Sequence, residues 1–461
     1  MRTHIADIAG QEGKEVELAG WVHARRDHGK LVFIDLRDRS GLAQVVFGPG
    51  VAAASDLRLE YVVRVKGEVK KRPPAMVNDK VPLGEYEVSA KELTILSVSA
   101  PLPFPVDTDG YEIDEEVRMK YRYLDLRRER MKRNLVLRNK VTRLVRDYME
   151  EHGFVEVETP TLTKTSPEGA RDFLVPSRMH PGKFYALPQA PQQYKQLLMI
   201  AGIERYFQLA HAMRDEDLRG DRQFEHTQID LEMSFATEEE VRVMVEGLMI
   251  RVAESCGKKI WKKPFPVFTH EEAMKKFGAD KFDLRSDEEK KDPDLMAFAW
   301  VVDFPLFEMD ETTKRYTFAH NPFSAPKAAH VEKLMKGEDL GILRAQQYDL
   351  VCNGYELASG GVRISDPVVQ RKVFEIMGLS AAQAEERFGH LVRAYEYGAP
   401  PHAGMAPGLD RLVMLLANEP NIREVIAFPV SANGQTAVMD APSEVDKAQL
   451  DELGLEIKKK K

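Results

Sequence analysis

The stretch Phe207–Phe235 holds more charged and amide side chains than an ordinary pair of core strands would bury. From Thr227 to Met233 polar and apolar residues alternate, which is typical of a β-strand, and the apolar run before Arg214 predicts a second strand. We therefore expect a hairpin of two long strands with one strongly polar face. The residues on that face would be Arg214, Glu216, Gln228, Asp230 and Glu232. Such a face either binds a charged ligand or lies in solvent as a set of ion pairs.

Three further segments carry side chains suited to an anionic ligand. They are Gln192 and Lys195 at the start of a predicted helix, Asp349, Glu356 and Arg363 around a glycine pair, and Arg411 in the first turn of a helix after HAGMAPGL. The loop Thr163–Phe173 is rich in charge, proline and glycine, which predicts either a lid over a polar ligand or an ordinary surface loop. His320 follows a strand-like run, where a lone histidine is more often structural than catalytic.

The composition excludes several classes of protein. A chain of 461 residues, 43% hydrophobic and 30% charged, is typical of a globular protein with two or three domains. Cys256 and Cys352 alone provide neither a disulfide framework nor a metal cluster. The sequence contains no apolar run long enough to span a membrane and no Walker A or GxGxxG pattern. We therefore expect a cytoplasmic protein that binds no membrane and has no P-loop or Rossmann site.

The first 100 residues predict a small β-barrel. The strand candidates are Val16–Val22, Leu31–Arg37, Leu42–Phe47, Tyr61–Val69 and Glu85–Leu96, with a helical piece at Val51–Leu59. Five strands with such a helix are typical of an OB fold. Arg25, Arg26 and other cations surround Phe33, which suits a face on which single-stranded bases stack. The alternative is that Phe33 packs inside the barrel.

A basic stretch follows the proline-rich connection at 101–109. The net charge of the chain is −8, yet 12 arginines and lysines between Arg118 and Arg146 are opposed only by Asp125 and Glu129. A phosphate-facing surface and a solvated helix face both remain open. Apolar residues at helical spacing predict a long helix that stops near Gly153, followed by a strand that ends at Pro160.

Together these segments resemble the class II aminoacyl-tRNA synthetases. The long helix and the strand ending in Glu158-Thr159-Pro160 resemble motif 1 (about 135–160), the hairpin resembles motif 2 (about 206–233), and HAGMAPGLDRLVMLL resembles motif 3 (about 402–417). The strings RDHGKLVFIDLRDRSG, TPTLTKTSPEGARDF and NGYELASGGVRI are similar to those of the bacterial-type aspartyl enzymes of class IIb. The resemblance implies an α+β fold with an OB-fold anticodon-binding domain (1–100), a linker (101–125), a catalytic domain on an antiparallel sheet (126–440) and a C-terminal extension (441–461).

The resemblance also implies an activity, that of an AMP-forming aspartate–tRNA ligase. ATP and L-aspartate would form aspartyl-adenylate, and the 3′ end of tRNA(Asp) would then accept the aspartyl group. ATP is a substrate in this reaction, Mg²⁺ is the cofactor, and the enzyme would be a homodimer through motif 1. His28 resembles the residue of non-discriminating members, which also charge tRNA(Asn), and we state this as a further hypothesis.

The roles of the family's residues transfer to the matching positions. Arg363 and Lys195 would bind the side-chain carboxylate of aspartate. The amino group and the wall of the same pocket would involve Glu168, Gln192, Gln228, Asp230 and His320. ATP would contact Arg214, Glu216, His226, Glu356, Gly408, Asp410 and Arg411, of which Arg214, Glu356 and Arg411 would act in catalysis. Mg²⁺ would be held by Asp349 and Glu356. The anticodon would contact Arg25, His28, Phe33, Gln44 and Glu87.

The chain departs from the family pattern at four places. The bacterial members carry a large domain between motifs 2 and 3, where this chain has a short linker around Ser286–Asp294. His226 stands where the family usually has an adenine-stacking phenylalanine, Ala190 where it has serine, and Asn321 where it has a second histidine.

Three other functions compete with this one. An asparaginyl or lysyl enzyme of the same class is disfavoured by Lys195 and Arg363, which suit an acidic substrate. An inactive paralogue that binds tRNA or an amino acid is disfavoured because the ATP and metal residues are retained. An asparagine synthetase with this catalytic fold should lack the barrel.

Overall fold

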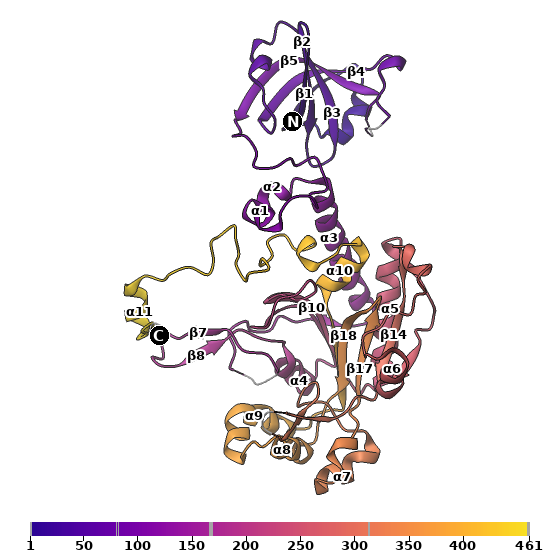
Figure 1. The fold of residues 1–461 in the computed structure, drawn as a ribbon, viewed down its shortest axis with the longest axis vertical. Helices are drawn as coiled ribbons and strands as arrows, with labels where there is room; N and C mark the ends of the chain where they lie inside the picture. The colour runs from indigo at the N-terminus through magenta and orange to yellow at the C-terminus, as the bar shows by residue number, and fades with distance from the viewer. Residues whose placement is uncertain (1, 80, 82, 166–168, 312–313, 459–461) are drawn as a thin grey trace. The chain divides into compact units, whose positions relative to one another are not determined.

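The computed structural model describes residues 2–79, 81, 83–165, 169–311 and 314–458 (Figure 1). The chain divides into two compact units, Met1–Glu112 and Ile113–Lys461. Residues 113–125, predicted as part of the linker, lie in the second unit and form α1 (Glu115–Lys120) and α2 (Arg122–Asp125). No helix in the described ranges combines the length and apolar character needed to cross a bilayer.

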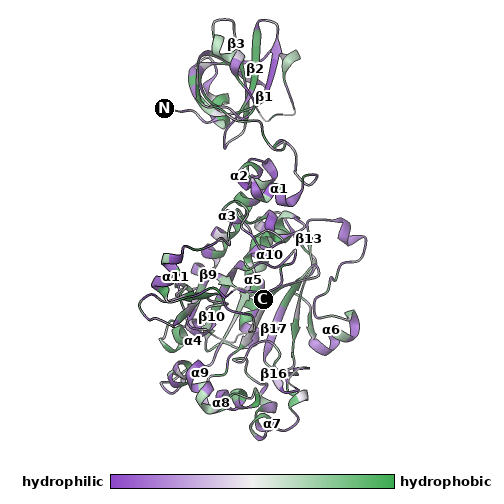
Figure 2. Cartoon of the chain, turned by 60° about the vertical axis from the view of Figure 1, so that its left-hand side comes forward, coloured by the Kyte–Doolittle hydropathy of each residue, from purple (hydrophilic) through white to green (hydrophobic). Residues whose placement is uncertain are grey.

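The first unit is a closed barrel of five strands, as the sequence predicts, and its strand order is β1-β2-β3-β5-β4. Its strands are β1 (Glu15–His28), β2 (Leu31–Arg37), β3 (Leu42–Phe47), β4 (Val62–Lys71) and β5 (Tyr86–Ser97). Figure 2 shows hydrophobic and hydrophilic residues interleaved along these strands, and alternate residues such as Ile34 and Leu36 form the barrel core. The 3-10 turns of this unit are η1 (Ile5–Gln11), η2 (Ala52–Asp56) and η3 (Pro74–Met76).

Two boundaries predicted in the barrel are wrong. β1 continues past Val22 to His28, because its charged second half pairs with β2 as far as His28 opposite Leu31. The helical piece predicted at Val51–Leu59 is only the short turn η2. Phe33 is only half-buried and lies on the outer face, since its neighbour Ile34 points inward. The alternative that Phe33 packs inside the barrel is therefore wrong.

The second unit is built on one large sheet with the order β12-β14-β17-β18-β19-β10-β9-β6. Its strands are β6 (Val155–Glu156), β9 (Arg205–Met213), β10 (Glu225–Ser234), β12 (Val267–Thr269), β14 (Phe298–Val302), β17 (Gln347–Cys352), β18 (Tyr355–Val362) and β19 (His402–Pro407). Only the outer pairs β6–β9 and β12–β14 are parallel among these neighbours. The predicted hairpin is β9–β10, with Asp230 opposite Gln208.

Helices α3 (Glu129–Glu151), α5 (Glu238–Ser255) and α10 (Leu409–Ala417) share one hydrophobic core with this sheet. The remaining helices are α4 (Gln192–Ile200), α6 (His270–Phe277), α7 (Val331–Lys336), α8 (Pro367–Ile376), α9 (Ala381–Tyr395) and α11 (Lys447–Leu453). The remaining short strands are β7 (Leu174–Pro176), β8 (Phe184–Ala186), β11 (Lys259–Ile260), β13 (Leu295–Met296), β15 (Phe307–Met309) and β16 (Tyr316–Phe318), and the 3-10 turns are η4 (Glu289–Lys291), η5 (Ala328–His330), η6 (Leu340–Ile342) and η7 (Ile422–Glu424). The strand expected at residues 318–323 ends at Phe318, because Asn321 accepts a hydrogen bond from the Phe323 N–H and forms a turn.

Part of the basic stretch forms a buried network of ion pairs. The guanidinium groups are those of Arg118, Arg122, Arg128 and Arg130, and the carboxylates are those of Asp125, Glu419 and Glu424. Glu424 receives bonds of 2.9 and 3.1 Å from Arg118 and of 2.9 Å from Arg130, and its side chain is fully buried. These four arginines therefore face neither phosphate nor solvent, and both interpretations of the stretch are wrong for them.

We expect Glu424→Gln to lower the free energy of unfolding by about 3 kcal/mol, because two buried arginines lose a shared counter-charge. Chemical denaturation measures this change. The matched control is Glu151→Gln, whose partner Arg251 lies at the surface, and whose loss should cost less than about 1 kcal/mol. Equal, small losses in both variants would contradict the expectation.

Candidate active site

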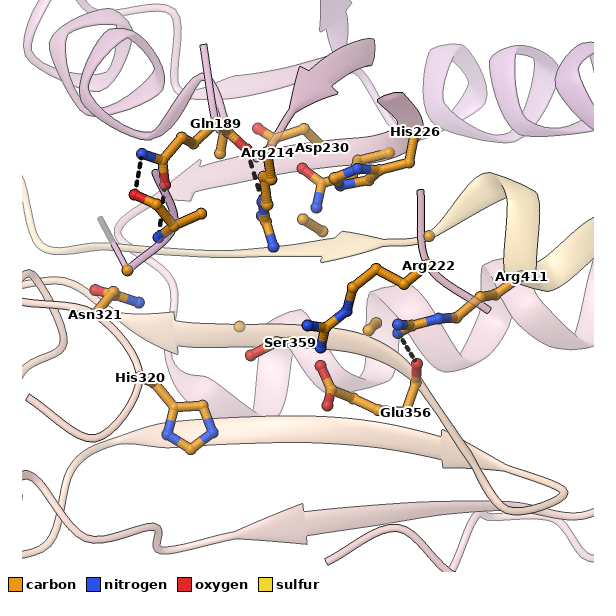
Figure 3. Close-up of a pocket in the computed structure, with 18 of the residues that line it drawn as sticks. Gln189, Arg214, Arg222, His226, Asp230, His320, Asn321, Glu356, Ser359 and Arg411 are labelled. Carbon is orange, nitrogen blue, oxygen red and sulfur yellow. Dashed lines mark hydrogen bonds between the residues drawn. The ribbon is translucent and has the colours of Figure 1, made fainter. Parts of the chain in front are cut away.

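A cavity of about 520 Å³ opens on the polar face of β10 (Figure 3). Among the residues that line it are Gln192, Lys195, Arg214, Glu216, His226, Gln228, Asp230, His320, Glu356, Arg363, Gly408, Asp410 and Arg411. All of them were predicted from the sequence as ligand-binding residues, and they come from segments up to 219 positions apart in the chain. Glu168 lies outside the described residues. Asp349 does not line the cavity but contacts His320, with 3.5 Å between Nε2 and Oδ2.

One end of the cavity holds two cations and two carboxylates, all fully buried. Lys195 Nζ lies 2.9 Å from Asp230 Oδ2 and 3.3 Å from Glu232 Oε2. Arg363 donates from Nε to Glu232 Oε1 at 2.9 Å and from Nη2 to Oε2 at 3.3 Å. Its Nη1 makes no hydrogen bond to any residue that the structure describes. This end of the cavity therefore keeps cationic donors in place for an anionic ligand.

Glu232 is a site residue for which the sequence interpretation assigned no role. It belongs to the same alternating face as Gln228 and Asp230, and this pattern was its only signal in the sequence. Although burial opposes the change, Arg363 and Lys195 lower the pKa of Glu232. Burial raises the pKa of Asp230 despite the opposing charge of Lys195. Glu232 contacts both Lys195 and Arg363, so it orients both cations.

Gln228 and His320 line the same cavity, and each has a buried polar atom without a hydrogen-bond partner in the described part of the chain. These atoms are Gln228 Oε1 and His320 Nδ1. Buried polar atoms are rarely left unsatisfied in native proteins, so such atoms in a cavity indicate a place for a ligand. Burial alone would lower the pKa of His320, but its hydrogen bond to Asp349 and the charge of that carboxylate raise it.

The other end of the cavity is surrounded by arginines that neighbouring groups hold in place. Arg214, at the end of β9, donates from Nε to the Gln189 carbonyl at 3.1 Å. Arg411, in the first turn of α10, donates to the Glu356 carbonyl at 2.6 Å and lies 3.1 Å from the Asp221 carboxylate. Figure 3 shows Arg214, Arg222 and Arg411 pointing toward one space from different segments. Preorganised cations of this kind suit a polyphosphate.

The loop of the motif 2 hairpin also contributes to this end. Asp221, Arg222 and Gln223 line the cavity, and Arg222 pairs with Glu216 at 2.7 Å. Our sequence analysis assigned these loop residues no role. Asp410 lines the cavity as well, but its carboxylate pairs with Arg138 of α3 and accepts the Thr227 N–H at 2.8 Å. It therefore joins motifs 1, 2 and 3 to one another.

His226 stands beside these arginines at the start of β10. Burial, together with the charges of Arg214 and Arg411, lowers the pKa of His226 to about 3. The imidazole is therefore neutral at physiological pH, and it offers an aromatic face to a ligand without adding charge. Because the pKa of His226 is lower in the folded protein than in the unfolded chain, its protonation makes the free energy of unfolding depend on pH.

We expect the free energy of unfolding to fall as the pH is lowered from 6.5 to 5, because the unfolded chain protonates His226 while the folded chain does not. A pKa of about 3 in the folded state makes this contribution as large as about 2 kcal/mol at pH 5. Chemical denaturation at both pH values should show a smaller fall in His226→Phe than in the unmodified protein. His180→Phe, which alters an exposed histidine, is the control. An equal fall in all three proteins would contradict the expectation.

Asp349 and Glu356 lie on the hairpin β17–β18. Burial raises the pKa of Asp349, and the charge of Glu356 raises it further, so the two carboxylates interact. Within the described residues no cluster of three or more histidine, cysteine, aspartate or glutamate side chains could hold a metal. Mg²⁺ is commonly held by one or two carboxylates together with substrate phosphates. The pair therefore fits such an ion only in company with a polyphosphate.

Four of the predicted anticodon residues, His28, Phe33, Gln44 and Glu87, lie on the outer face of the barrel, whereas Arg25 lies opposite the inward-pointing Ile34. Gln44 of β3 donates to Glu87 of β5 at 2.9 Å, and the rings of His28 and Phe33 meet edge to face with 5.5 Å between centroids. Arg25 instead pairs with Asp27 at 2.7 Å and donates to the Ser55 carbonyl.

Comparisons with known proteins agree with this architecture. Residues 114–432 match the model of the tRNA synthetases class II (D, K and N), and residues 16–96 match that of the OB-fold nucleic acid binding domain. The aspartate–tRNA(Asp/Asn) ligase of Rubrobacter xylanophilus is 43% identical over 99% of this chain and 97% of that protein. The aspartate–tRNA ligase of Staphylococcus saprophyticus is 39% identical over 96% and 97%.

The alignment with the Rubrobacter xylanophilus ligase is longer than this chain. It has 584 positions against a chain of 461 residues, so at least 123 positions have no counterpart here. That number is the length of a typical domain.

Solved structures show the same fold. An asparaginyl-tRNA synthetase of Pyrococcus horikoshii, with asparaginyl-adenylate, superposes with a TM-score of 0.74 at 22% identity, covering 93% of this chain and 98% of that one. An aspartyl-tRNA synthetase of Entamoeba histolytica superposes with a TM-score of 0.73 at 20% identity, covering 93% and 91%. The family model matches more than half of this chain, and a full-length relative is 43% identical to it. This chain therefore belongs to the class II tRNA synthetases of the D, K and N group.

Proposed function

We propose that this protein is an aspartate–tRNA ligase, which uses ATP to attach L-aspartate to tRNA. The observation that carries this proposal is the pairing of Lys195 and Arg363 at one end of a cavity whose other end is lined by arginines. The first end suits a carboxylate side chain and the second suits a triphosphate. Relatives at about 40% identity along their whole length are named aspartate–tRNA ligases.

The arrangement supports adenylate formation by charge neutralisation. The α-carboxylate of aspartate attacks the α-phosphorus of ATP, the bond to the pyrophosphate oxygen breaks, and pyrophosphate leaves. Both reactants are anions, so the approach needs fixed cations, and we assign Arg214 to the α-phosphate and Arg411 to the adenine and the outer phosphates. Asp349 and Glu356 would hold Mg²⁺, which neutralises the charge of the triphosphate when it is bound. His226 would stack on the adenine. In the second step, the ribose hydroxyl at the 3′ end of tRNA attacks the mixed anhydride, and AMP leaves.

The cationic end also explains selection of aspartate. An asparagine side chain has the same shape but no charge, so it would leave the buried Lys195 and Arg363 without the anion that they are arranged to meet. Gln228 and Asp230, which face the same pocket, would hold the α-amino group, and Gln192 would support them. Asp410 would position the motifs, since both of its oxygens are engaged by the protein.

Charging of purified tRNA(Asp) and tRNA(Asn) with aspartate tests the tRNA specificity. We propose that this enzyme charges both, because His28 and Phe33 share the barrel face that would meet the anticodon, and several relatives are named aspartate–tRNA(Asp/Asn) ligases. Comparable initial rates on the two tRNAs would support the proposal. Strict preference for tRNA(Asp) would limit the enzyme to that tRNA, and charging of neither would contradict the ligase itself.

We further propose a homodimer through motif 1. Strand β6 lies at the edge of the large sheet, and Val155 on it and Leu162 beyond it are each 49% exposed. Exposed apolar side chains at an open sheet edge suit a second copy. Both cysteines are free thiols, which fits the cytoplasmic location that we also propose.

A further inference from the structure

Lys281 brings a cation into the cavity from the segment that connects α6 to β14. Its Nζ lies 2.7 Å from Glu356 Oε2, and the lysine is one of the residues that line the cavity. Our sequence analysis assigned Lys281 no role. Although burial opposes the change, Lys281 is the largest of the charges that lower the pKa of Glu356.

The neighbour of Lys281 fixes its position relative to Glu356. Phe282 is buried and stacks on Phe277, with 4.0 Å between ring centroids. Its carbonyl accepts the Gly354 N–H at 3.1 Å. Gly354 belongs to the turn between β17 and β18, and β18 carries Glu356. The backbone next to Lys281 is therefore fixed to the hairpin that carries the proposed metal carboxylates, and this contact positions the lysine in the site.

The pair between Lys281 and Glu356 is nevertheless easy to open. The lysine side chain is 47% exposed and the glutamate side chain 29%, whereas the pairs of Lys195 and Arg363 are fully buried. Ion pairs near solvent contribute little, because water and salt screen them. A triphosphate offers several negative charges, and its metal ion would compete for Glu356. Both changes favour release of the lysine from the carboxylate.

We propose that Lys281 is a triphosphate-binding residue that is held on Glu356 in the absence of nucleotide and transfers to the phosphates when ATP enters. In the same exchange Glu356 becomes available to the metal ion. This inference rests on the proposed function, since it deepens the account of the nucleotide end of that site. A lysine that only fastened the connecting segment would leave nucleotide affinity unchanged.

Calorimetry with α,β-methylene-ATP and Mg²⁺ tests the exchange on the full chain. We expect Lys281→Met to weaken binding about 10- to 30-fold, the effect of losing one charge-assisted contact, and Lys281→Arg to stay within about threefold. The matched control is Lys291→Met, which removes a lysine of the same segment that pairs with Glu288 and does not line the cavity. It should bind the analogue as the unmodified protein does.

A second measurement should show tighter binding in the same variant, this time of a metal ion. Electron paramagnetic resonance of Mn²⁺ with nucleotide-free protein should show binding about threefold or more tighter in Lys281→Met, because the metal no longer competes with a lysine for Glu356. Unchanged affinity for the nucleotide analogue in that variant, with its circular dichroism intact, would overturn the inference. If the methionine variant does not fold, Lys281→Gln serves in its place under the same criteria. Failure of the unmodified protein to bind the analogue would overturn the proposed function as well.

Discussion

Replacing Arg363 with leucine is expected to lower kcat/KM for aspartate in pyrophosphate–ATP exchange by about 10³-fold, which corresponds to about 4 kcal/mol. The guanidinium is buried, and among the described residues none accepts a hydrogen bond from its Nη1. This nitrogen can therefore bind a ligand. Its removal takes away the counter-charge for the substrate carboxylate and leaves Glu232 with Lys195 alone. The KM for ATP should change by less than about threefold, because Arg363 lies at the other end of the cavity.

Loss of stability has to be separated from loss of binding in this variant. The double variant Arg363→Leu with Glu232→Gln removes both members of the buried pair, so it should recover stability but not aspartate activation. Arg371→Leu is the matched control, since Arg371 pairs with Glu396 at the surface. Retention of kcat/KM within about tenfold in Arg363→Leu would show that this residue does not bind the carboxylate of aspartate.

Replacing Arg214 with alanine is expected to lower the rate of adenylate formation by about 10³-fold or more, with little change in KM for aspartate. Negative charge on the α-phosphate builds up in the transition state, and Arg214, at the end of β9, is the cation that we assign to this phosphate. Its bond to the Gln189 carbonyl fixes the guanidinium before substrate arrives, so no reorganisation is needed during the reaction. Single-turnover measurement of adenylate formation isolates this step from product release.

Arg219 offers a control within the same hairpin. It lies in the loop between β9 and β10, but it does not line the cavity, so Arg219→Ala should keep the rate of adenylate formation within about threefold. A rise in KM for both substrates with an unchanged rate constant in Arg214→Ala would contradict the assignment. That result would mean that the arginine binds the ground state and the transition state equally.

The sequence predicts strands and faces well where apolar and polar residues alternate. The hairpin β9–β10 and the five barrel strands have this pattern, and both are present. The second half of β1 is charged on both faces, so its pairing with β2 was missed. The turn at Asn321 depends on a side chain that binds the backbone two residues later, and such a contact leaves no periodic signal.

The sequence alone does not reveal which charged side chains form ion pairs when they lie far apart in the chain. The buried state of Arg118 depends on Glu424, which follows 306 positions later, and a run of cations without that partner looks solvent-exposed. Glu232 was seen as part of a polar face, but its role depends on Arg363, 131 positions away. Lys281 meets Glu356 only because Phe282 packs beside the β17–β18 turn. Resemblance to a family supplied the roles of the motif residues, which periodicity could not.

Amino-acid-dependent pyrophosphate–ATP exchange, with aspartate, asparagine and lysine measured side by side, tests the central claim most directly. The account predicts exchange with aspartate and a rate at least about 10²-fold lower with the other two, because neither has a side-chain carboxylate for Lys195 and Arg363 to bind. Exchange driven by asparagine or lysine would contradict the assignment of this pair. No exchange with any of the three would contradict adenylate formation and leave a protein that binds these ligands without reacting them.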